Sequence, residues 1–249
     1  MKILHILDHS LPIMTGYTFR TREIILHQRA MGWQTIHLTT PRQNASDIPA
    51  ETASGLEFYR TPKSTSVLGS IPGLWPLAEM MATRKRLDEV VEAERPDILH
   101  AHSPALDAWP AIGAGKRFGI PVVYEVRGFW EDAAVDHGTT VEGGLRYRVS
   151  RQIESMALRR ADAVTAICHG LADEIAATRG VARETITLIP NAVDVSRFDF
   201  VPGTRPEVKQ KLGLGSGPVV GFLGSFYGYE GLALLLRAFP AVTRAMPDA

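Results

Sequence analysis

The chain has 249 residues, of which 45% are hydrophobic and 22% are charged, and its 27 basic residues balance 27 acidic ones. This composition is typical of a globular protein, and the length suits one large domain or one domain with part of a second. The zero net charge argues against nucleic acid as the main ligand, because neutralising phosphates requires a basic excess.

Residues 1–8 form an apolar run of strand length and lack the long apolar region and the cleavage site of a signal peptide. The single cysteine, Cys168, excludes a disulfide framework and a zinc site of several thiolates, and it fits a reducing compartment. No apolar stretch reaches the roughly 18 residues that a transmembrane helix requires. We therefore expect a cytoplasmic protein, whose apolar segment 71–82 is long enough only to lie on the inner face of a membrane.

Short apolar runs alternate with helical patterns, which predicts an α/β fold with a doubly wound parallel sheet covered by helices on both faces. In the first unit, residues 2–7 and 33–39 are predicted strands, and residues 19–31 are a predicted helix that ends at Gly32. Later units repeat this pattern. The further expected helices are 76–93, 105–118, 169–179 and one within 143–160, and the further expected strands are 97–101, 121–126, 162–167 and 185–189.

Two kinds of segment interrupt the repeating pattern. Residues 44–55 and 63–72 are polar or rich in glycine and proline, and we expect loops there. Residues 201–217 have the composition of a linker, and residues 218–223 and 232–246 are a predicted strand and helix. One strand and one helix cannot bury their own apolar faces, so a domain of residues 1–200 is expected to precede a second domain that is cut short within 218–249.

The strand-to-helix loops are the expected binding region, because ligands of a doubly wound sheet bind at the carboxyl ends of its strands. Four loops carry polar or glycine residues at these ends. They are residues 11–17, 100–103, 125–131 and 189–194.

Taken in chain order together with residues 224–231, these loops resemble those of the family 4 (group 1) glycosyltransferases, which have the two-domain GT-B fold. Gly16 falls on the second glycine of the family's Gly-Gly loop, and Thr15 replaces the first. Residues 95–102 (RPDILHAH) look like the family's PDxxHxH strand, and residues 189–194 (IPNAVD) look like its PNGVD domain junction. Residues 219–239 look like the opening of its nucleotide-sugar domain.

This resemblance implies a Rossmann-like acceptor-side domain in residues 1–200 and the first αβ unit of a nucleotide-sugar-binding domain in residues 218–249. It implies a retaining hexosyltransferase that moves a sugar from a nucleotide diphosphate sugar to a polysaccharide or a lipid-linked acceptor, without a metal or another cofactor. Full members of the family are longer, so the chain by itself is expected to be inactive. Residues 229–232 (YEGL) are also similar to an exosortase-associated exopolysaccharide subgroup.

The family pattern points to six site residues. The expected catalytic residues are Arg127, which stands where many members have a histidine near the donor sugar, and His102, which we expect to reach the cleft. The expected donor-binding residues are Gly16, Gly224, Ser225 and Glu230. Ser225 and Glu230 replace a basic pair of the family, and a carboxylate beside a diphosphate would be repulsive.

A purely structural interpretation remains open for several of these residues. Arg127 ends an apolar strand and would equally suit a salt bridge to Glu125, Glu131 or Asp132. An arginine binds anions, but it cannot act as a general base near neutral pH. His100 and His102 share one face of a strand, which suits a metal, yet no third ligand stands at a recognisable spacing and no metal is expected.

Two other classes of function are alternatives to a transferase. The chain could be a non-catalytic acceptor-binding or membrane-surface module, since the basic run 84–86 and Arg95 lie near Trp75 and Met81 and would suit anionic lipid. A dinucleotide-dependent oxidoreductase is disfavoured, because no Gly-x-Gly-x-x-Gly follows the first strand. The apolar residues of 218–246 also predict self-association, because their own neighbours in a sheet are missing.

Overall fold

The computed structural model describes residues 1–43, 48–71, 73–198, 206–215, 217–224, 226 and 228–247. The chain divides into two compact units. The first comprises residues 1–131 and 143–191, and the second comprises residues 132–142 and 192–249.

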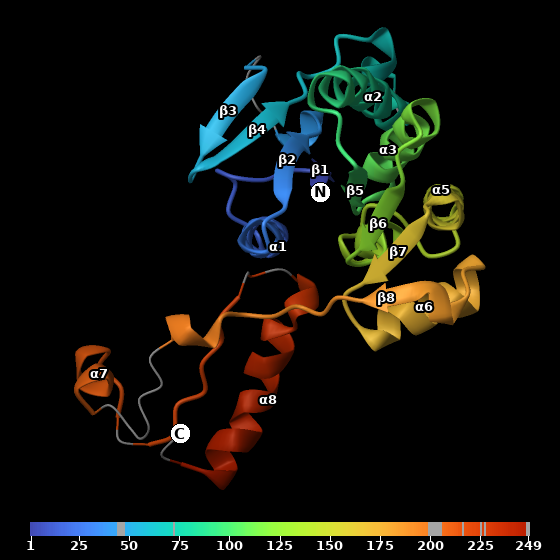
Figure 1. Ribbon diagram of the computed structural model, residues 1–249. Helices are drawn as coiled ribbons and strands as arrows, with labels where there is room; N and C mark the ends of the chain where they lie inside the picture. The colour runs from blue at the N-terminus through green and yellow to red at the C-terminus, as the bar shows by residue number, and fades with distance from the viewer. Residues whose placement is uncertain are drawn as a thin grey trace. The chain divides into compact units, whose positions relative to one another are not determined.

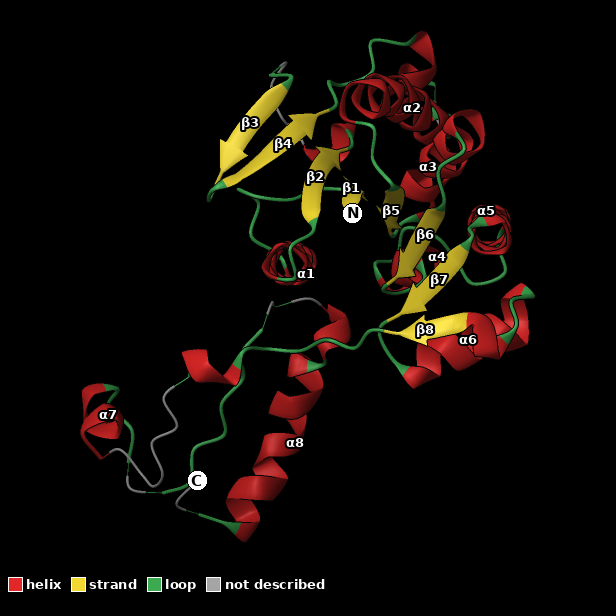
Figure 2. Cartoon of the chain, viewed as in Figure 1, coloured by secondary structure: helices red, strands yellow, loops and turns green. Residues whose placement is uncertain are grey.

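The first unit is built on one eight-stranded sheet with the order β3-β4-β2-β1-β5-β6-β7-β8 (Figures 1 and 2). Its strands are β1 (Lys2–Leu7), β2 (Gln34–Thr39), β3 (Ala50–Ala53), β4 (Leu56–Arg60), β5 (Ile98–His102), β6 (Val122–Val126), β7 (Ala163–Ala166) and β8 (Ile186–Leu188). All neighbouring strands pair in parallel except β3 and β4, which form an antiparallel hairpin. The predicted doubly wound α/β fold is confirmed.

The strand order places a topological switch point between β1 and β5. The chain first adds β2, β4 and β3 on one side of β1, and then returns to add β5 to β8 on the other side. At such a point the loops that leave the two central strands run to opposite faces of the sheet and open a crevice between them. The carboxyl ends of β1 and β5 are therefore where a binding site is expected.

Helices cover both faces of this sheet, with α1 on one face and α2, α3 and α5 on the other (Figure 1). The helices of the chain are α1 (Gly16–Ala30), α2 (Trp75–Glu94), α3 (Ala105–Phe118), α4 (Trp130–Asp136), α5 (Leu145–Arg160), α6 (His169–Arg179), α7 (Pro206–Lys211) and α8 (Leu232–Ala245). The larger apolar core lies between the sheet and α2, α3, α5 and α6, and includes Leu4, Leu99 and Tyr124. The smaller core lies under α1 and includes Leu7 and Ile25.

The first helix shows how local sequence sets its ends. The Thr15 side chain caps its N-terminus by accepting a hydrogen bond from the amide of Thr18, so α1 begins at Gly16, three residues before the predicted start. Gly32 follows its C-terminus with φ of +83°, as its predicted role as a helix stop requires.

Two predicted loops contain regular structure. Residues 50–53 form strand β3, and residues 67–70 form a short 3-10 helix, η2 (Val67–Ser70). Strand β3 is at the edge of the sheet, pairs only with β4 and buries no side chain fully, so its sequence lacks the apolar alternation of a strand. The turn before β4 depends on Ser54 and Gly55, which have φ of +49° and +75°.

In the second unit, α8 confirms the predicted helix at 232–246, but the predicted strand at 218–223 is wrong. Its described residues have no strand structure, because a strand requires a hydrogen-bonded neighbour and this unit supplies none among its described residues. The expected linker at 201–217 lies partly outside the described residues, and the domain boundaries stay a prediction.

Gly115 is required by the contact between α3 and the sheet. A Cβ at this position would lie 2.6 Å from both the Ile120 carbonyl oxygen and Val122 Cγ2. We expect Gly115→Ala to lower the free energy of unfolding by roughly 1–3 kcal/mol, although alanine favours a helix. The matched control is Gly113→Ala on the same helix, where a Cβ would meet only the flexible Arg117 guanidinium at 3.3 Å. Equal stabilities of the two variants in urea denaturation would contradict this explanation.

Candidate functional site

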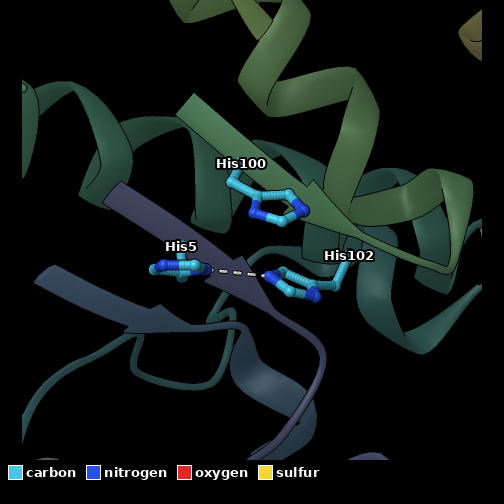
Figure 3. A group of neighbouring side chains, drawn as sticks. All are labelled: His5, His100 and His102. Atoms are coloured by element: carbon cyan, nitrogen blue, oxygen red, sulfur yellow. Dashed lines mark hydrogen bonds between the residues drawn. The ribbon is translucent and has the colours of Figure 1, made fainter. Parts of the chain in front are cut away.

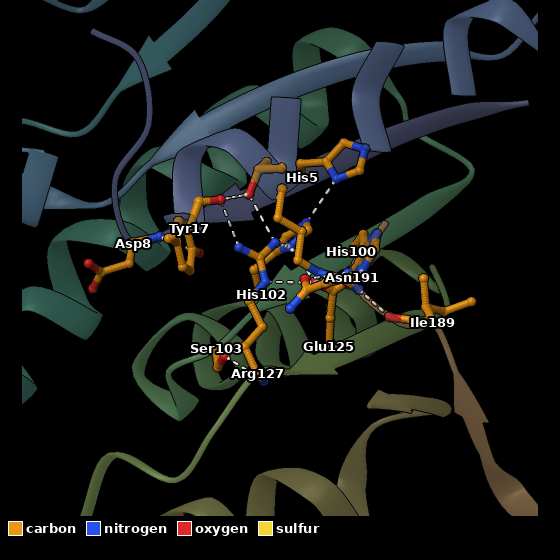
Figure 4. A network of polar contacts seen from close by, with 12 residues as sticks. His5, Asp8, Tyr17, His100, His102, Ser103, Glu125, Arg127, Ile189 and Asn191 are labelled. Carbon is orange, nitrogen blue, oxygen red and sulfur yellow. Dashed lines mark hydrogen bonds and ion pairs between the residues drawn. The ribbon is translucent and has the colours of Figure 1, made fainter. Parts of the chain in front are cut away.

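A cluster of polar side chains lies at the switch point of the first unit (Figure 4). We call it the switch-point cluster, and its members are His5, Arg20, His100, His102, Glu125 and Arg127. They come from β1, α1, β5 and β6, together with the residue that follows β6. The sheet therefore brings together residues from three separate parts of the sequence.

Three histidines of the unit form a row across the sheet. His37, His5 and His100 occupy paired positions on β2, β1 and β5. Their ring centroids are 6.0 Å apart for the first pair and 5.1 Å for the second, and the ring of His102 stacks on that of His100 at 4.2 Å. His5 Nε2 contacts Gln28 of α1, so the row lies on the sheet face that α1 covers.

The hydrogen bonds that link Arg127, His102, His5 and Gln28 run in one direction, which the guanidinium of Arg127 sets. Arginine only donates, so His102 Nδ1 accepts from Arg127 Nη2 at 2.6 Å and the proton of His102 resides on Nε2. His102 Nε2–H then donates to His5 Nδ1 at 3.0 Å, and His5 Nε2–H donates to Gln28 Oε1 at 2.8 Å. Both histidines are thereby assigned the neutral Nε2–H form.

His5, His100 and His102 also resemble a metal-binding group, since their ligating atoms lie within 4.8 Å of one another (Figure 3). His5 is the third histidine that the sequence spacing did not indicate, and only the pairing of β1 with β5 places it there. However, hydrogen bonds engage both ring nitrogens of His5 and of His102. A metal would have to displace these bonds, so the geometry favours a hydrogen-bonded network.

Burial favours the neutral imidazoles of His5, His37 and His102. Desolvation, followed by the neighbouring histidines, lowers the pKa of His5 well below its usual value. Desolvation also lowers the pKa of His37 to about 4 and, together with His100, lowers that of His102 to about 3. Near pH 7 the imidazoles of His5, His37 and His102 are therefore neutral.

Glu125 is the anionic centre of the cluster. Its side chain is 1% exposed, and Oε1 accepts from Arg127 Nε at 2.7 Å and from Arg20 Nε at 3.0 Å. Burial opposes its charged form, yet the pKa of Glu125 is held well below its usual range by His102, His100 and Arg127. The guanidiniums of Arg127 and Arg20 are the permanent cations that pair with this carboxylate.

Arg127 forms an ion pair with Glu125, which was one of the salt bridges that the sequence suggested for it. Four of its five N–H groups donate hydrogen bonds, to Glu125, to the Tyr17 carbonyl, to Thr21 and to His102. Its guanidinium also lies 4.2 Å from the centre of the Tyr17 ring. Arg127 thus holds the first turns of α1 against β6, while its catalytic role stays a prediction.

Arg20 is a member of the cluster that the sequence analysis missed. Besides Glu125, it donates to the carbonyls of Ile189 and Pro190 and to the side chain of Asn191. These acceptors follow β8, so Arg20 ties α1 to the end of the first unit. Its partners lie 105 to 171 residues away in the sequence, so no local pattern indicated them.

A second group of polar residues surrounds the carboxyl end of β1. Asp8 contacts His9 Nδ1 at 2.8 Å and Arg42 Nε at 3.0 Å, and His9 Nε2 lies 2.9 Å from the hydroxyl of Thr15. Asp107 is buried, and neither of its carboxylate oxygens has a hydrogen-bond partner among the described residues. Burial, followed by Asp8, raises the pKa of Asp107 well above its usual value, so its neutral form is favoured. Asp107 is therefore a buried carboxyl group whose hydrogen-bonding capacity is unused among the described residues.

The four expected donor-binding residues belong to two parts of the sequence, one at Gly16 and the other at residues 224–230. Gly16 is the first residue of α1, and a Cβ there would meet nothing within 4 Å. Gly224 and Glu230 belong to the second unit, where Glu230 is exposed in the 3-10 helix η5 (Gly228–Glu230). Ser225 lies outside the described residues.

Comparison with known proteins assigns the family. The family model described as "Glycosyl transferase 4-like domain" matches residues 15–192, which include β2 to β8 and the whole switch-point cluster apart from His5. The chain belongs to this family. Residues 193–249 lie outside the match.

Curated relatives of this glycosyltransferase 4-like chain are glycosyltransferases. It is 31% identical over 137 residues to 2-deoxystreptamine glucosyltransferase of Streptomyces kanamyceticus, covering 54% of this chain and 35% of that one. It is 27% identical over 237 residues to a GDP-mannose-dependent alpha-mannosyltransferase of Mycolicibacterium smegmatis, covering 90% of this chain and 56% of that one. The chain therefore spans between about a third and just over half of the length of these relatives.

Solved structures support the fold. Sucrose-phosphate synthase from Thermosynechococcus elongatus superposes with a TM-score of 0.70 at 14% identity, covering 96% of this chain and 59% of that chain. Starch synthase IV from Arabidopsis thaliana superposes with a TM-score of 0.66 at 13% identity, covering 97% and 66%. At these identities the likeness establishes the GT-B type of fold alone. Among the described residues, no helix combines the length and the apolar character needed to cross a bilayer.

Proposed function

We propose that the protein is a retaining glycosyltransferase that transfers a sugar from a nucleotide diphosphate sugar to a polysaccharide or lipid-linked acceptor. One observation supports this proposal most strongly. The polar cluster lies at the switch point of the sheet and, apart from His5, within the region that matches the glycosyltransferase 4-like family. The printed names of the relatives, which include a glucosyltransferase and GDP-mannose-dependent mannosyltransferases, support a nucleotide-sugar donor. No metal or other cofactor enters this proposal.

The first unit would bind the acceptor. Asp8, His9 and Asp107 offer hydrogen-bonding groups at the carboxyl end of the sheet, and acceptor hydroxyls are their natural partners. His102 and Arg127 would act at the same edge by positioning the loop that contains Gly16, since Arg127 holds the adjacent turn of α1. Gly224, Ser225 and Glu230 stay proposed donor-binding residues, and catalysis would depend on positioning and on stabilising the diphosphate leaving group.

Ligand binding tests this function directly. The ¹⁵N-labelled chain would be titrated with oligosaccharides, with short lipid-linked sugars and with nucleotide sugars, and amide shifts would be recorded. We expect acceptor compounds to shift the amides of Asp8, Tyr17 and Arg127, and we expect the chain by itself not to turn over a nucleotide sugar. Acceptor compounds that shift none of these amides would contradict the proposal.

The role of Arg127 can be separated from its charge. Arg127→Lys keeps a cation beside Glu125 but loses the fork that reaches Tyr17 and Thr21, so the first turn of α1 loses its support. We expect acceptor affinity to fall about ten-fold or more. The matched control is Arg183→Lys in the exposed pair with Asp173, which should leave the affinity unchanged. Equal affinities of both variants and the natural protein would exclude the positioning role.

A non-catalytic acceptor-binding module is the second candidate. The same hydrogen-bonding groups of the first unit support it. In this case the complete protein would bind the acceptor without transferring a sugar. A transfer assay with radiolabelled nucleotide sugars separates the two functions, because only a transferase labels the acceptor.

We also propose two partner interactions. One is peripheral contact with a membrane, and the other is self-association through residues 218–246. The second is supported by α8, whose Leu234 and Leu236 are 65% and 64% exposed. Sedimentation velocity at increasing protein concentration tests self-association, with Leu236→Glu as the disrupting variant.

A further inference from the structure

An exposed apolar surface covers η2 and the first turns of α2. Six large apolar side chains are between 38% and 78% exposed, and we call them the α2 patch: Val67, Ile71, Leu74, Trp75, Leu77 and Met81. The two segments pack on each other, since a Cβ at Gly69 would lie 3.8 Å from Ala78 Cβ. The six residues therefore belong to one supersecondary unit. Scattered apolar side chains are normal on a surface, whereas a gathered set indicates an interaction.

The outward stripe of α2 changes character along the helix. Leu74, Leu77 and Met81 follow one another at helical spacing and are exposed. The next turn of the same stripe carries Arg84 and Lys85, which are also exposed. An apolar end bordered by a basic turn is the pattern of a helix that lies at a membrane surface.

The structure also separates the basic residues that can contact a surface from those that cannot. Arg86 is occupied by Glu89 and by the carbonyls of Arg60 and Pro49. Arg95 lies at the far end of α2, beyond its last turn. No ion pair involves Arg84 or Lys85 within the described part of the chain, so their charges are available to an anionic partner.

The α2 patch adjoins the polar groups at the carboxyl end of β1. The Arg42 guanidinium lies 5.6 Å from the centre of the Trp75 ring, and Arg42 Nε lies 3.0 Å from Asp8 Oδ1. Trp75 starts α2 at the end of the loop that leaves β4, on the side of the sheet where the strands end. A surface bound at the patch would therefore be next to the proposed acceptor site.

We propose that the α2 patch docks the protein on an anionic phospholipid bilayer. The apolar side chains would enter the interface, Trp75 would lie at the level of the headgroups, and Arg84 and Lys85 would contact lipid phosphates. The basic turn favours a bilayer over an apolar groove of another protein, because the charges border the apolar end on one outward stripe. The use of this surface to present a lipid-linked acceptor rests on the proposed function, whereas the docking itself does not.

Vesicle flotation with the 249-residue chain and without any sugar nucleotide tests the docking. Vesicles of phosphatidylcholine with 30% phosphatidylglycerol would be compared with vesicles of pure phosphatidylcholine (about a third anionic lipid, enough for the surface potential of a cytoplasmic leaflet). We expect the anionic vesicles to bind the chain about ten-fold or more tightly than the neutral ones. The double variants Leu77→Glu with Met81→Glu and Arg84→Glu with Lys85→Glu should each weaken anionic binding about ten-fold or more.

Two matched variants make the test specific. Leu145→Glu changes an equally apolar and 82% exposed residue on α5, and Val141→Glu changes a 70% exposed apolar residue before this helix. Both should bind anionic vesicles as the natural chain does, and unchanged circular dichroism would show that the variants fold. Absent vesicle binding, or binding that survives both changes in the α2 patch, would overturn the proposal. Either result leaves the glycosyltransferase proposal intact, because no sugar is present.

Discussion

Replacing Glu125 with alanine should lower the free energy of unfolding by about 3–5 kcal/mol, which is the usual cost of breaking a buried ion pair. The carboxylate is buried and balances the guanidiniums of both Arg127 and Arg20. Without it, two neighbouring cations would remain in a site that is nearly closed to water. Urea denaturation at pH 7 measures the loss.

The control for this prediction is an ion pair of similar length at the surface. Arg183 Nε and Asp173 Oδ1 are 2.6 Å apart, but these side chains are 35% and 65% exposed. Asp173→Ala should therefore cost no more than about 1 kcal/mol. Glu125→Gln keeps the shape of the side chain but not its charge. We therefore expect it to lose most of the unfolding free energy that Glu125→Ala loses. A Gln variant as stable as the natural protein would show that the charge of Glu125 is not needed.

Acid should remove the stabilising contribution of the buried residue His37. His37 has a pKa lowered from 6.5 to about 4 by burial, and it bonds the Glu57 carbonyl and the Thr35 hydroxyl. A pKa that is lower in the folded state gives stability that is complete above pH 6.5 and is lost as the pH falls toward 4. At about 1.4 kcal/mol for each pH unit, this loss amounts to about 3 kcal/mol.

The measurement is the difference in unfolding free energy between the natural chain and His37→Gln, followed from pH 7.5 to pH 4. We expect the advantage of the natural chain to shrink as the pH falls. Glu154→Gln is a control of opposite sign, because burial raises the pKa of Glu154 to about 7 and its stabilising contribution is lost as the pH rises from 4.5 through 7. Parallel pH curves for the natural chain and His37→Gln would contradict a neutral, buried His37.

Most elements of the fold followed from local pattern. The strand at 2–7 and the helices at 105–118 and 169–179 have the predicted bounds, because apolar periodicity and end signals act within a few residues. Strand β3 escaped prediction because it is exposed and has one neighbour. The strand predicted at 218–223 fails for the converse reason, since apolar character alone does not supply the neighbour that a strand requires.

The candidate site divides in the same way. The sequence predicted His102 and Arg127 as site residues from the family pattern, and it named Glu125 as one possible salt-bridge partner of Arg127. The sequence could not predict which of these side chains bond to one another. The partners of His5, Arg20 and Gln28 lie 97, 105 and 23 residues away. Only the pairing of β1 with β5 and the packing of α1 on the sheet decide these contacts.

By itself, the amino-acid sequence determined the class of fold, the edge of the sheet at which chemistry is expected and the resemblance to the glycosyltransferase 4-like family. These properties depend on periodicity and on motif order, which are local or one-dimensional. The tertiary structure decided which charges are balanced and which remain free, so that Arg127 and Arg86 are engaged while Arg84 and Lys85 are exposed. Burial and pairing arise only when strands and helices distant in sequence meet. They affect the free energy of a charged side chain more strongly than its residue type does.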